Sequence, residues 1–402
     1  MRLFTLASCA LYFLTGLTSI SIGSVLPELL GHYQLSYTVG GQMIFIGAMG
    51  FMTGVLITSW LNRRFPPRPI LSLSALVIAV AQFSILFLPP FPIFVALFFL
   101  NSIGSAAIGI VVATMFIEVF IGRQAVAMSY LEVAFGLGAF LMPLLASFFI
   151  ALGIWRYLFL ITALIAAFLA YIWTRVPYSR QSEAGKEPLD ASGSSKPVVL
   201  SARKKAIILG LFAVIIFLYG GLEGSLNNFM SSIFIHYLNQ AAWFASLSVG
   251  VFWGSMVIGR ALTGWIIRKI TYSNYLLINI SGAIVSLVLF ILLKNAWLGF
   301  GFVAILGLMM SGIYSITLVF ANYSIPNSAS MVTPIISGLS GLGSAFFPAI
   351  TGLAIDQFGI HATLWYIVGI AIGYLLFLLI IDRMRGGHMP RLRFRLAHFR
   401  AQ

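Results

Sequence analysis

The sequence predicts an all-α membrane protein whose twelve transmembrane helices form two similar halves of six helices each. Three observations support this fold class. Of the 402 residues, 60% are hydrophobic and 8% are charged, whereas a soluble domain carries about 25% charged residues. Apolar runs recur along the chain, and segments of the first half reappear in the second half at a nearly constant offset. Together these features predict helices that span a lipid bilayer.

Charged, polar or proline-rich breaks separate the apolar runs. A helix that crosses a bilayer needs about 20 predominantly apolar residues, and each run is close to this length or longer. We therefore expect twelve spans, which place both termini on the same side of the membrane. The expected spans are 4–29, 38–61, 70–88, 92–119, 126–152, 156–174, 206–231, 244–267, 274–293, 297–321, 333–355 and 362–382.

The basic residues indicate the orientation. A net charge of +14 would suggest nucleic acid as the partner of a soluble protein. Here all 23 Lys and Arg residues except Arg156, Arg260 and Lys294 fall on one side of the expected spans. By the positive-inside rule that side is cytoplasmic. We expect a monomeric multi-pass protein of the bacterial plasma membrane, with both termini cytoplasmic, anionic lipid at the basic loops and tail, and no nucleic-acid partner.

A polar segment rich in Pro, Gly and Ser divides the chain. Such a composition is typical of a flexible linker. The expected domains are a six-helix half at 1–174, a cytoplasmic linker at 175–205, a second six-helix half at 206–382 and a basic tail at 383–402.

The two halves repeat in the same order at an offset of 204 or 205 residues. Gly, Thr, Trp and two basic positions coincide in one pair of segments, a Gly-Leu-Gly run followed by Pro in a second, and Phe-Leu-x-Gly in a third. Parallel repeats of this kind place a transport site between two halves. The paired segments are 54–65 with 259–270, 136–143 with 341–348, and 13–16 with 217–220.

With these repeats the chain resembles the major facilitator superfamily over almost its whole length. Segment 54–68 takes the place of the superfamily's loop between the second and third spans. It departs from the usual motif, because Arg63 stands where an acid is expected and Pro66 where the second glycine is expected.

Three segments, 128–139, 217–229 and 252–260, give a more specific resemblance. They are similar to the fucose/glucose–proton symporter family, and within it to the bacillar glucose/mannose–proton symporter branch. The resemblance implies transport of a hexose together with protons.

The acidic residues depart from that family. Ile110 lies near the place of the acid that members carry in the fourth span, and Glu118 lies about two turns nearer the cytoplasm. The first-span acid is also missing, because Glu28 falls at the outer end of its span. The resemblance therefore implies that proton coupling has moved to Glu223 or Glu132, or that it has been lost.

The seventh span carries the most informative polar residues. Tyr219, Glu223 and Asn227 recur every fourth residue, so they share one helix face, and Asn228 lies beside them. Acids at membrane depth usually face a bundle interior or a water-filled cavity. This stripe is either the solute-facing wall of a transporter or a buried polar cluster that only holds helices together.

Sugars need several hydrogen-bonding groups for their hydroxyls and aromatic rings for their C–H faces. Residues of these types recur at mid-membrane depth, and the seventh-span group together with the indole of the eighth span is the strongest set. Each residue alone also suits helix packing. The candidates for solute binding are Gln42, Asn101, Tyr219, Asn227, Asn228, Trp253, Asn279 and Tyr314.

Two carboxylates are candidates for proton coupling, and one of them also for a gate. Glu223 has apolar flanks and no cation within a turn of its own helix, a setting that favours a protonated carboxyl group. Glu132 and Arg260 lie at matched depth on the fifth and eighth spans, so a pair between the halves would close the cytoplasmic side. The alternative is pairing within one half, for example of Glu132 with Arg123.

The sequence contains no metalloprotease, serine-hydrolase or P-loop motif, and its five His residues are not clustered. We expect no enzyme, cofactor or metal. The predicted function is symport of a glucose- or mannose-like hexose with protons by alternating access. Two alternatives stay open: a proton-driven efflux antiporter for lipophilic compounds and a non-transporting membrane receptor. Solute specificity distinguishes the three.

Overall fold

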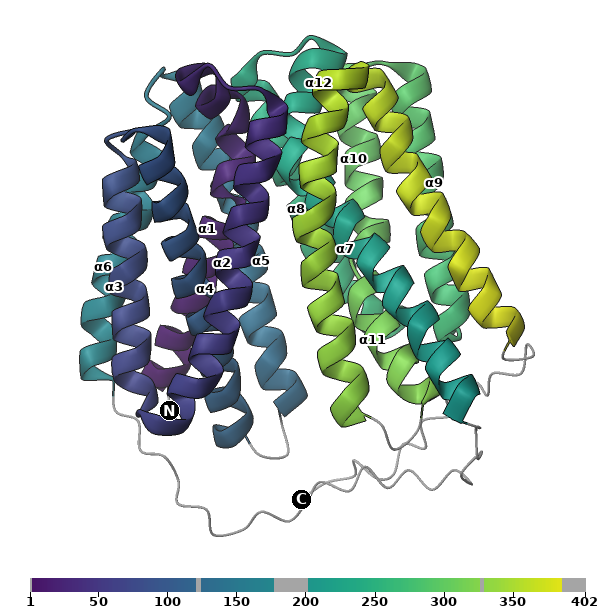
Figure 1. Cartoon of the computed structure of the whole chain (residues 1–402), viewed down its shortest axis with the longest axis horizontal. Coiled ribbons are helices and arrows are strands. Elements are labelled where there is room, and N and C mark those ends of the chain that lie inside the picture. The colour runs from purple at the N-terminus through teal and green to yellow at the C-terminus, as the bar shows by residue number, and fades with distance from the viewer. Residues whose placement is uncertain (1, 121–123, 177–201, 326–328, 385–402) are drawn as a thin grey trace.

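The computed structural model describes residues 2–120, 124–176, 202–325 and 329–384. Every regular element in this part of the chain is a helix. Figure 1 shows two bundles side by side, the purple-to-blue helices α1–α6 and the teal-to-yellow helices α7–α12. The predicted all-α membrane fold is confirmed. Most of the linker 175–205 and of the tail 383–402 lies outside the described residues.

The helices of the first half begin and end at local signals. The Ser36 side chain accepts a hydrogen bond from the Val39 amide at the start of α2, and Pro residues open α3 and α4. Both devices satisfy or remove backbone N–H groups that have no partner in the first turn. The helices are α1 (Arg2–Tyr33), α2 (Tyr37–Arg64), α3 (Pro67–Ile85), α4 (Phe91–Val119), α5 (Gln124–Ala151) and α6 (Tyr157–Arg175).

The second half contains the same number of labelled helices but divides them differently. The expected tenth span is interrupted at Ser311 and Gly312, which separate α10 from α11. The interruption leaves the last carbonyl groups of α10 without partners in their own helix. The helices are α7 (Ala202–Leu238), α8 (Ala242–Ile266), α9 (Tyr272–Leu293), α10 (Ala296–Met310), α11 (Ile313–Ser324) and α12 (Ala329–Met384).

Helix α12 contains two spans. Its 56 residues include Gly359, which has φ 77° and ψ 168°, a conformation open to glycine because glycine has no Cβ. The chain turns there between the expected spans 333–355 and 362–382. In the described residues eleven continuous helical segments are long and apolar enough to cross a membrane, and the turn in α12 makes twelve crossings. Accordingly, α1 begins and α12 ends at the same end of the bundle (Figure 1).

The repeated glycines mark where helices cross within each half. A Cβ added at Gly138 of α5 would clash with the backbone carbonyl oxygen of Phe13 on α1. At the equivalent position of the second half, a Cβ at Gly343 of α12 would clash with the carbonyl oxygen of Phe217 on α7. Small residues let backbones approach this closely in membrane bundles. Two of the three repeated segment pairs thus form equivalent helix crossings, α1–α5 in the first half and α7–α12 in the second.

The two halves meet mainly along three helix pairs, α1 with α7, α2 with α12, and α5 with α8, and α1 also contacts α8. Gly23 lies against the backbone of Asn227, and Gly41 lies against the backbone of Pro348 and Ala349. The bundles lie close together at the end opposite the N-terminus and separate toward the N-terminal end (Figure 1).

Candidate transport site

The polar stripe of α7 consists of Tyr219, Glu223 and Asn227. It faces other helices of the second half and also the first half. Tyr219 is buried, with 1% of its surface exposed. Its hydroxyl donates to the backbone carbonyl of Met310 at 3.1 Å. Met310 is the last residue of α10, so Tyr219 satisfies one of the carbonyl groups that the helix interruption leaves free.

Glu223 lies one turn further along the same face and is partly buried. The Glu223 carboxyl group interacts with the Tyr219 hydroxyl. The charges of Arg260 and Glu132 also act on this carboxyl group. Arg260 belongs to α8, so the tertiary structure supplies a cation that is absent from the neighbourhood of Glu223 along the chain.

Trp253 of α8 lies between Arg260 and Asn227 and contacts both. The indole Nε1 donates to the Asn227 Oδ1 at 2.7 Å. The ring of Phe135 from α5 meets the indole edge-on with centroids 5.8 Å apart. The Arg260 guanidinium lies over the Trp253 ring, 5.7 Å from its centroid. Trp253 is thus held by groups from both halves of the protein.

The structure brings Glu132 and Arg260 together. Arg260 Nη1 lies 3.4 Å from Glu132 Oε2, joining α8 to α5. The exposed fractions of the two side chains are 31% and 56%, respectively. Exposed pairs of this kind contribute about 0–1 kcal/mol, so the contact can break readily. The alternative partner, Arg123, lies outside the described residues.

The remaining candidates of the second half make local contacts. Asn228 donates to the Gly224 carbonyl at 2.8 Å, and Asn279 donates to the Tyr275 carbonyl at 2.8 Å, each within its own helix. The Tyr314 hydroxyl donates to Ser337 Oγ at 3.0 Å, between α11 and α12. None of these contacts joins them to Glu223 or Trp253.

Two candidates of the first half lie apart from the cluster. Gln42 is exposed on α2. Asn101 is 3% exposed and accepts from Gln82 Nε2 at 3.0 Å, while Thr162 donates to Gln82 Oε1 at 3.0 Å. This network joins α3, α4 and α6 inside one half, where its amides satisfy one another and hold helices together. Asn101 is therefore separate from the cluster around Glu223.

Sequence reasoning missed Phe135 and missed the link between Glu223 and the Glu132–Arg260 pair. Phe135 lies three residues after Glu132 on α5, so helical spacing places both on one face and was a usable signal. The approach of Arg260 to Glu223 had no such signal, because it depends on how α8 packs against α7.

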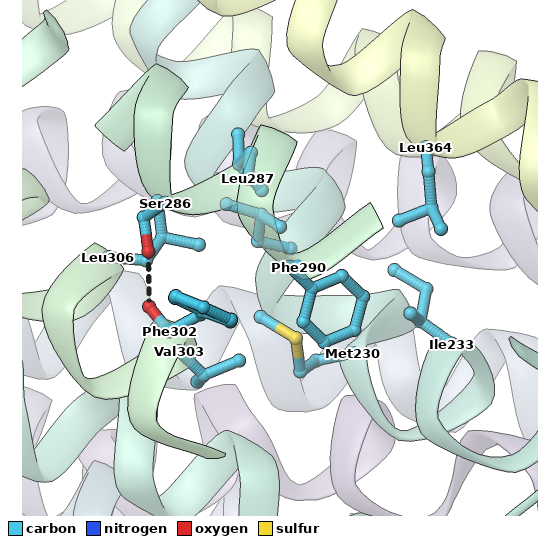
Figure 2. A pocket seen from close by; sticks show the side chains of 10 residues that line it. Met230, Ile233, Ser286, Leu287, Phe290, Phe302, Val303, Leu306 and Leu364 are labelled. Atoms are coloured by element: carbon cyan, nitrogen blue, oxygen red, sulfur yellow. Dashed lines mark hydrogen bonds between the residues drawn. The ribbon is translucent and has the colours of Figure 1, made fainter. Parts of the chain in front are cut away.

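A separate apolar cavity lies inside the second half, between α7, α9, α10 and α12. Figure 2 shows Met230, Phe290, Val303 and Leu364 around it. The Ser286 hydroxyl at its wall donates to the Phe302 carbonyl at 2.6 Å, so it is already satisfied. The cavity offers no free polar group of its own for sugar hydroxyls and does not touch the Glu223 cluster.

The described chain thus consists of two six-span bundles with an ionisable and aromatic cluster where they meet. This is the architecture of a secondary membrane transporter, in which the site lies between two repeats.

The chain belongs to the Major Facilitator Superfamily, whose family model matches residues 8–334. It is 31% identical over 352 residues to the glucose/mannose transporter GlcP of Bacillus subtilis (strain 168), covering 87% of each chain. It is a transport protein of this superfamily and not an enzyme.

Solved structures share the fold. A bacterial homolog of the human lysosomal transporter Spinster, in an inward-facing and occupied conformation, has a TM-score of 0.75 at 14% identity and covers 94% of this chain and 96% of its own. A D-xylose–proton symporter has a TM-score of 0.75 at 16% identity, covering 94% and 97%. At these identities the likeness concerns the fold alone.

Proposed function

We propose that this chain is a proton-coupled symporter of a glucose- or mannose-like hexose. The observation that carries the proposal is the cluster in which Glu223 of one half interacts with Tyr219, Arg260 and, across the halves, Glu132. A relative that transports glucose and mannose supports the solute class. The superfamily fold supports alternating access around a site between the halves.

Hydrogen-bond complementarity gives Glu223 two distinct states. The single proton of the Tyr219 hydroxyl can be directed at the Met310 carbonyl or at an ionised Glu223. A protonated Glu223 can donate to the Tyr219 oxygen while that hydroxyl donates to Met310, and an ionised Glu223 can only accept. When ionised, Glu223 instead has the Arg260 guanidinium as its nearby cation.

Arg260 then links the proton to the gate. Its guanidinium contacts Glu132 at 3.4 Å and also acts on Glu223. Deprotonation of Glu223 draws Arg260 toward α7 and weakens its contact with α5, whereas protonation releases Arg260 to Glu132. The cytoplasmic pairing of the halves thereby depends on the protonation of Glu223.

Trp253 and Asn227 form the proposed sugar-binding element. The indole N–H is taken by Asn227 Oδ1, which fixes the amide and leaves its Nδ2 group to donate to a sugar hydroxyl. The indole face and Phe135 provide aromatic surface for the sugar's C–H groups. We assign Asn228, Tyr314, Asn279 and Gln42 no direct role on this geometry.

The proposed topology places both termini and the linker in the cytoplasm of a bacterium. The distribution of basic residues supports it. On this topology, the end of the bundle that carries the N-terminus in Figure 1 is the inner end and the opposite end is the outer end.

Uptake of radiolabelled glucose into proteoliposomes tests the function. We expect accumulation when an inward proton gradient is imposed and equilibration without it, with mannose competing. An inward gradient of one pH unit supports about tenfold accumulation if one proton moves with each sugar. Flux that ignores the gradient would contradict proton coupling. Expulsion of a lipophilic cation, or sugar binding without flux, would favour the antiporter or the receptor.

Exchanging the charges of Glu132 and Arg260 tests the shared role of Arg260. We expect Glu132→Arg and Arg260→Glu alone to reduce glucose exchange, since each leaves two like charges facing one another. The double variant should recover exchange, because the pair between the halves is restored. It should not recover gradient-driven accumulation, because the acid at 260 would then lie beside Glu223. The measurements are exchange and accumulation in the same proteoliposomes. If the double variant recovers both exchange and accumulation, Arg260 has no role in the proton coupling of Glu223. If it recovers neither, the Glu132–Arg260 pair does not act as a gate.

A further inference from the structure

Asp356 joins the two halves at the outer end. It lies on α12, three residues before the turn at Gly359. Its Oδ1 accepts from the Tyr37 amide at 3.1 Å, and its Oδ2 accepts from the Thr38 amide and the Thr38 hydroxyl, both at 2.6 Å. Tyr37 and Thr38 are the first two residues of α2. An acid of the second half thus binds the beginning of a helix of the first half.

Such a contact is strong because of where it is made. The first N–H groups of a helix have no partner within the helix, and the helix dipole favours a negative charge at this end. Hydrogen bonds to an ionised acceptor are roughly twice as strong as neutral ones. Asp356 combines all three effects, and it does so between elements that must separate if the outer end opens.

Neighbouring contacts hold the same place together. Gly352, one turn before Asp356, lets α12 lie directly against the backbone carbonyl of Tyr37. The Tyr37 hydroxyl also hydrogen-bonds with His236 Nε2 of α7 at 2.7 Å. Opening the outer end therefore breaks a compact set of contacts around the first turn of α2.

The internal repeat offers a built-in comparison. At the offset of 205 residues, Tyr37 corresponds to Ala242 at the start of α8, and Asp356 corresponds to Ala151 at the end of α5. Helix α8 starts after Ala241, which makes no side-chain capping hydrogen bond. The carboxylate contact is present at one of the two equivalent helix crossings and absent from the other, so the fold does not require it.

We propose that Asp356 is an outer latch, whose bonds to Tyr37 and Thr38 hold the halves together at the outer end and set the balance between inward-open and outward-open molecules. Both contacts are exposed, but Asp356 accepts three hydrogen bonds, at 3.1, 2.6 and 2.6 Å, whereas the Glu132–Arg260 pair at the inner end is a single contact of 3.4 Å. Loss of the Asp356 charge should therefore shift the balance toward molecules that open outward.

A distance measurement between the outer ends of the two halves tests the latch. Spin labels at Phe87 and Trp297, in a Cys9→Ser background, report on exposed outer positions of the two halves. We expect Asp356→Asn to raise the ratio of outer-open to outer-closed molecules about tenfold. Thr38→Val removes only the hydroxyl donor and should give a smaller shift in the same direction.

Asp382→Asn is the matched control. Asp382 accepts from Ser273 Oγ at 2.6 Å, a contact within the second half, so its loss should leave the outer distance unchanged. An Asp356→Asn protein that elutes as folded and keeps the wild-type distance distribution would overturn the latch. So would an equal shift in the Asp382→Asn control.

The latch depends on the proposed topology only for which end of the bundle faces the cytoplasm. The distances are measured on purified full-length protein without solute. A failure of hexose transport would therefore leave the result for the latch unaffected, and a failure of the latch would leave the solute assignment unaffected.

Discussion

Proteoliposomes containing Glu223→Gln are expected to exchange glucose but not to accumulate it against its gradient. Glutamine keeps the size and hydrogen-bonding capacity of the protonated carboxyl group but cannot ionise. The variant should therefore bind sugar and complete the sugar-loaded half of the cycle. It should not release a proton, so a gradient that supports about tenfold accumulation in the wild type at one pH unit should support none. The measurement is internal against external radiolabelled glucose at steady state, with counterflow in the same vesicles.

The matched control for this experiment is Glu132→Gln. Glu132 is 56% exposed and pairs with Arg260 at 3.4 Å, and glutamine can still accept from the guanidinium. Accumulation should be reduced but not abolished in this variant, because the gate contact is weakened while Glu223 can still ionise. If accumulation is instead lost in Glu132→Gln and kept in Glu223→Gln, coupling resides in Glu132. If neither variant loses it, neither acid carries the proton.

Gly343→Ala is expected to destabilise the protein strongly, while Gly341→Ala is not. A Cβ at Gly343 would clash with the Phe217 backbone carbonyl oxygen, and backbone atoms at a helix crossing can move apart only if α7 and α12 separate. Overpacking of this kind costs about 1–3 kcal/mol. At Gly341 an added Cβ meets no atom within 4 Å. Thermal unfolding of the purified proteins in detergent measures the difference.

The two glycines lie on the same helix and two residues apart, so the pair controls for changes in helix propensity, which alanine improves at both sites. The equivalent Gly138→Ala should behave like Gly343→Ala, because Gly138 faces the Phe13 carbonyl in the same way. Equal unfolding temperatures for Gly343→Ala and Gly341→Ala would show that the α7–α12 crossing tolerates a methyl group.

Much of the fold was predictable from local features of the sequence. The lengths of the apolar runs and the breaks between them located nearly every helix, because a bilayer imposes a span length and demands satisfied backbone groups. The interruption at Ser311 and Gly312 was not predicted, since the apolar run passes through it. The turn at Gly359 within α12 falls between the expected spans 333–355 and 362–382, as the break in the apolar pattern predicts.

The candidate site was predictable only along single helices. Helical periodicity placed Tyr219, Glu223 and Asn227 on one face, and matched depth suggested Glu132 with Arg260. Periodicity cannot show which helix faces which, so it could not show that Asn101 pairs with Gln82 inside the first half.

By itself, the sequence determined that this is a membrane protein, where its spans lie, that its halves repeat and which residues are unusual at membrane depth. These properties follow from composition and spacing, which act locally. Only the tertiary structure decided that Trp253 holds Asn227, that Arg260 pairs with Glu132 and also acts electrostatically on Glu223, and that Asp356 binds the first turn of α2. Each of these contacts joins residues on different helices, and their geometry is set by how the helices pack against one another.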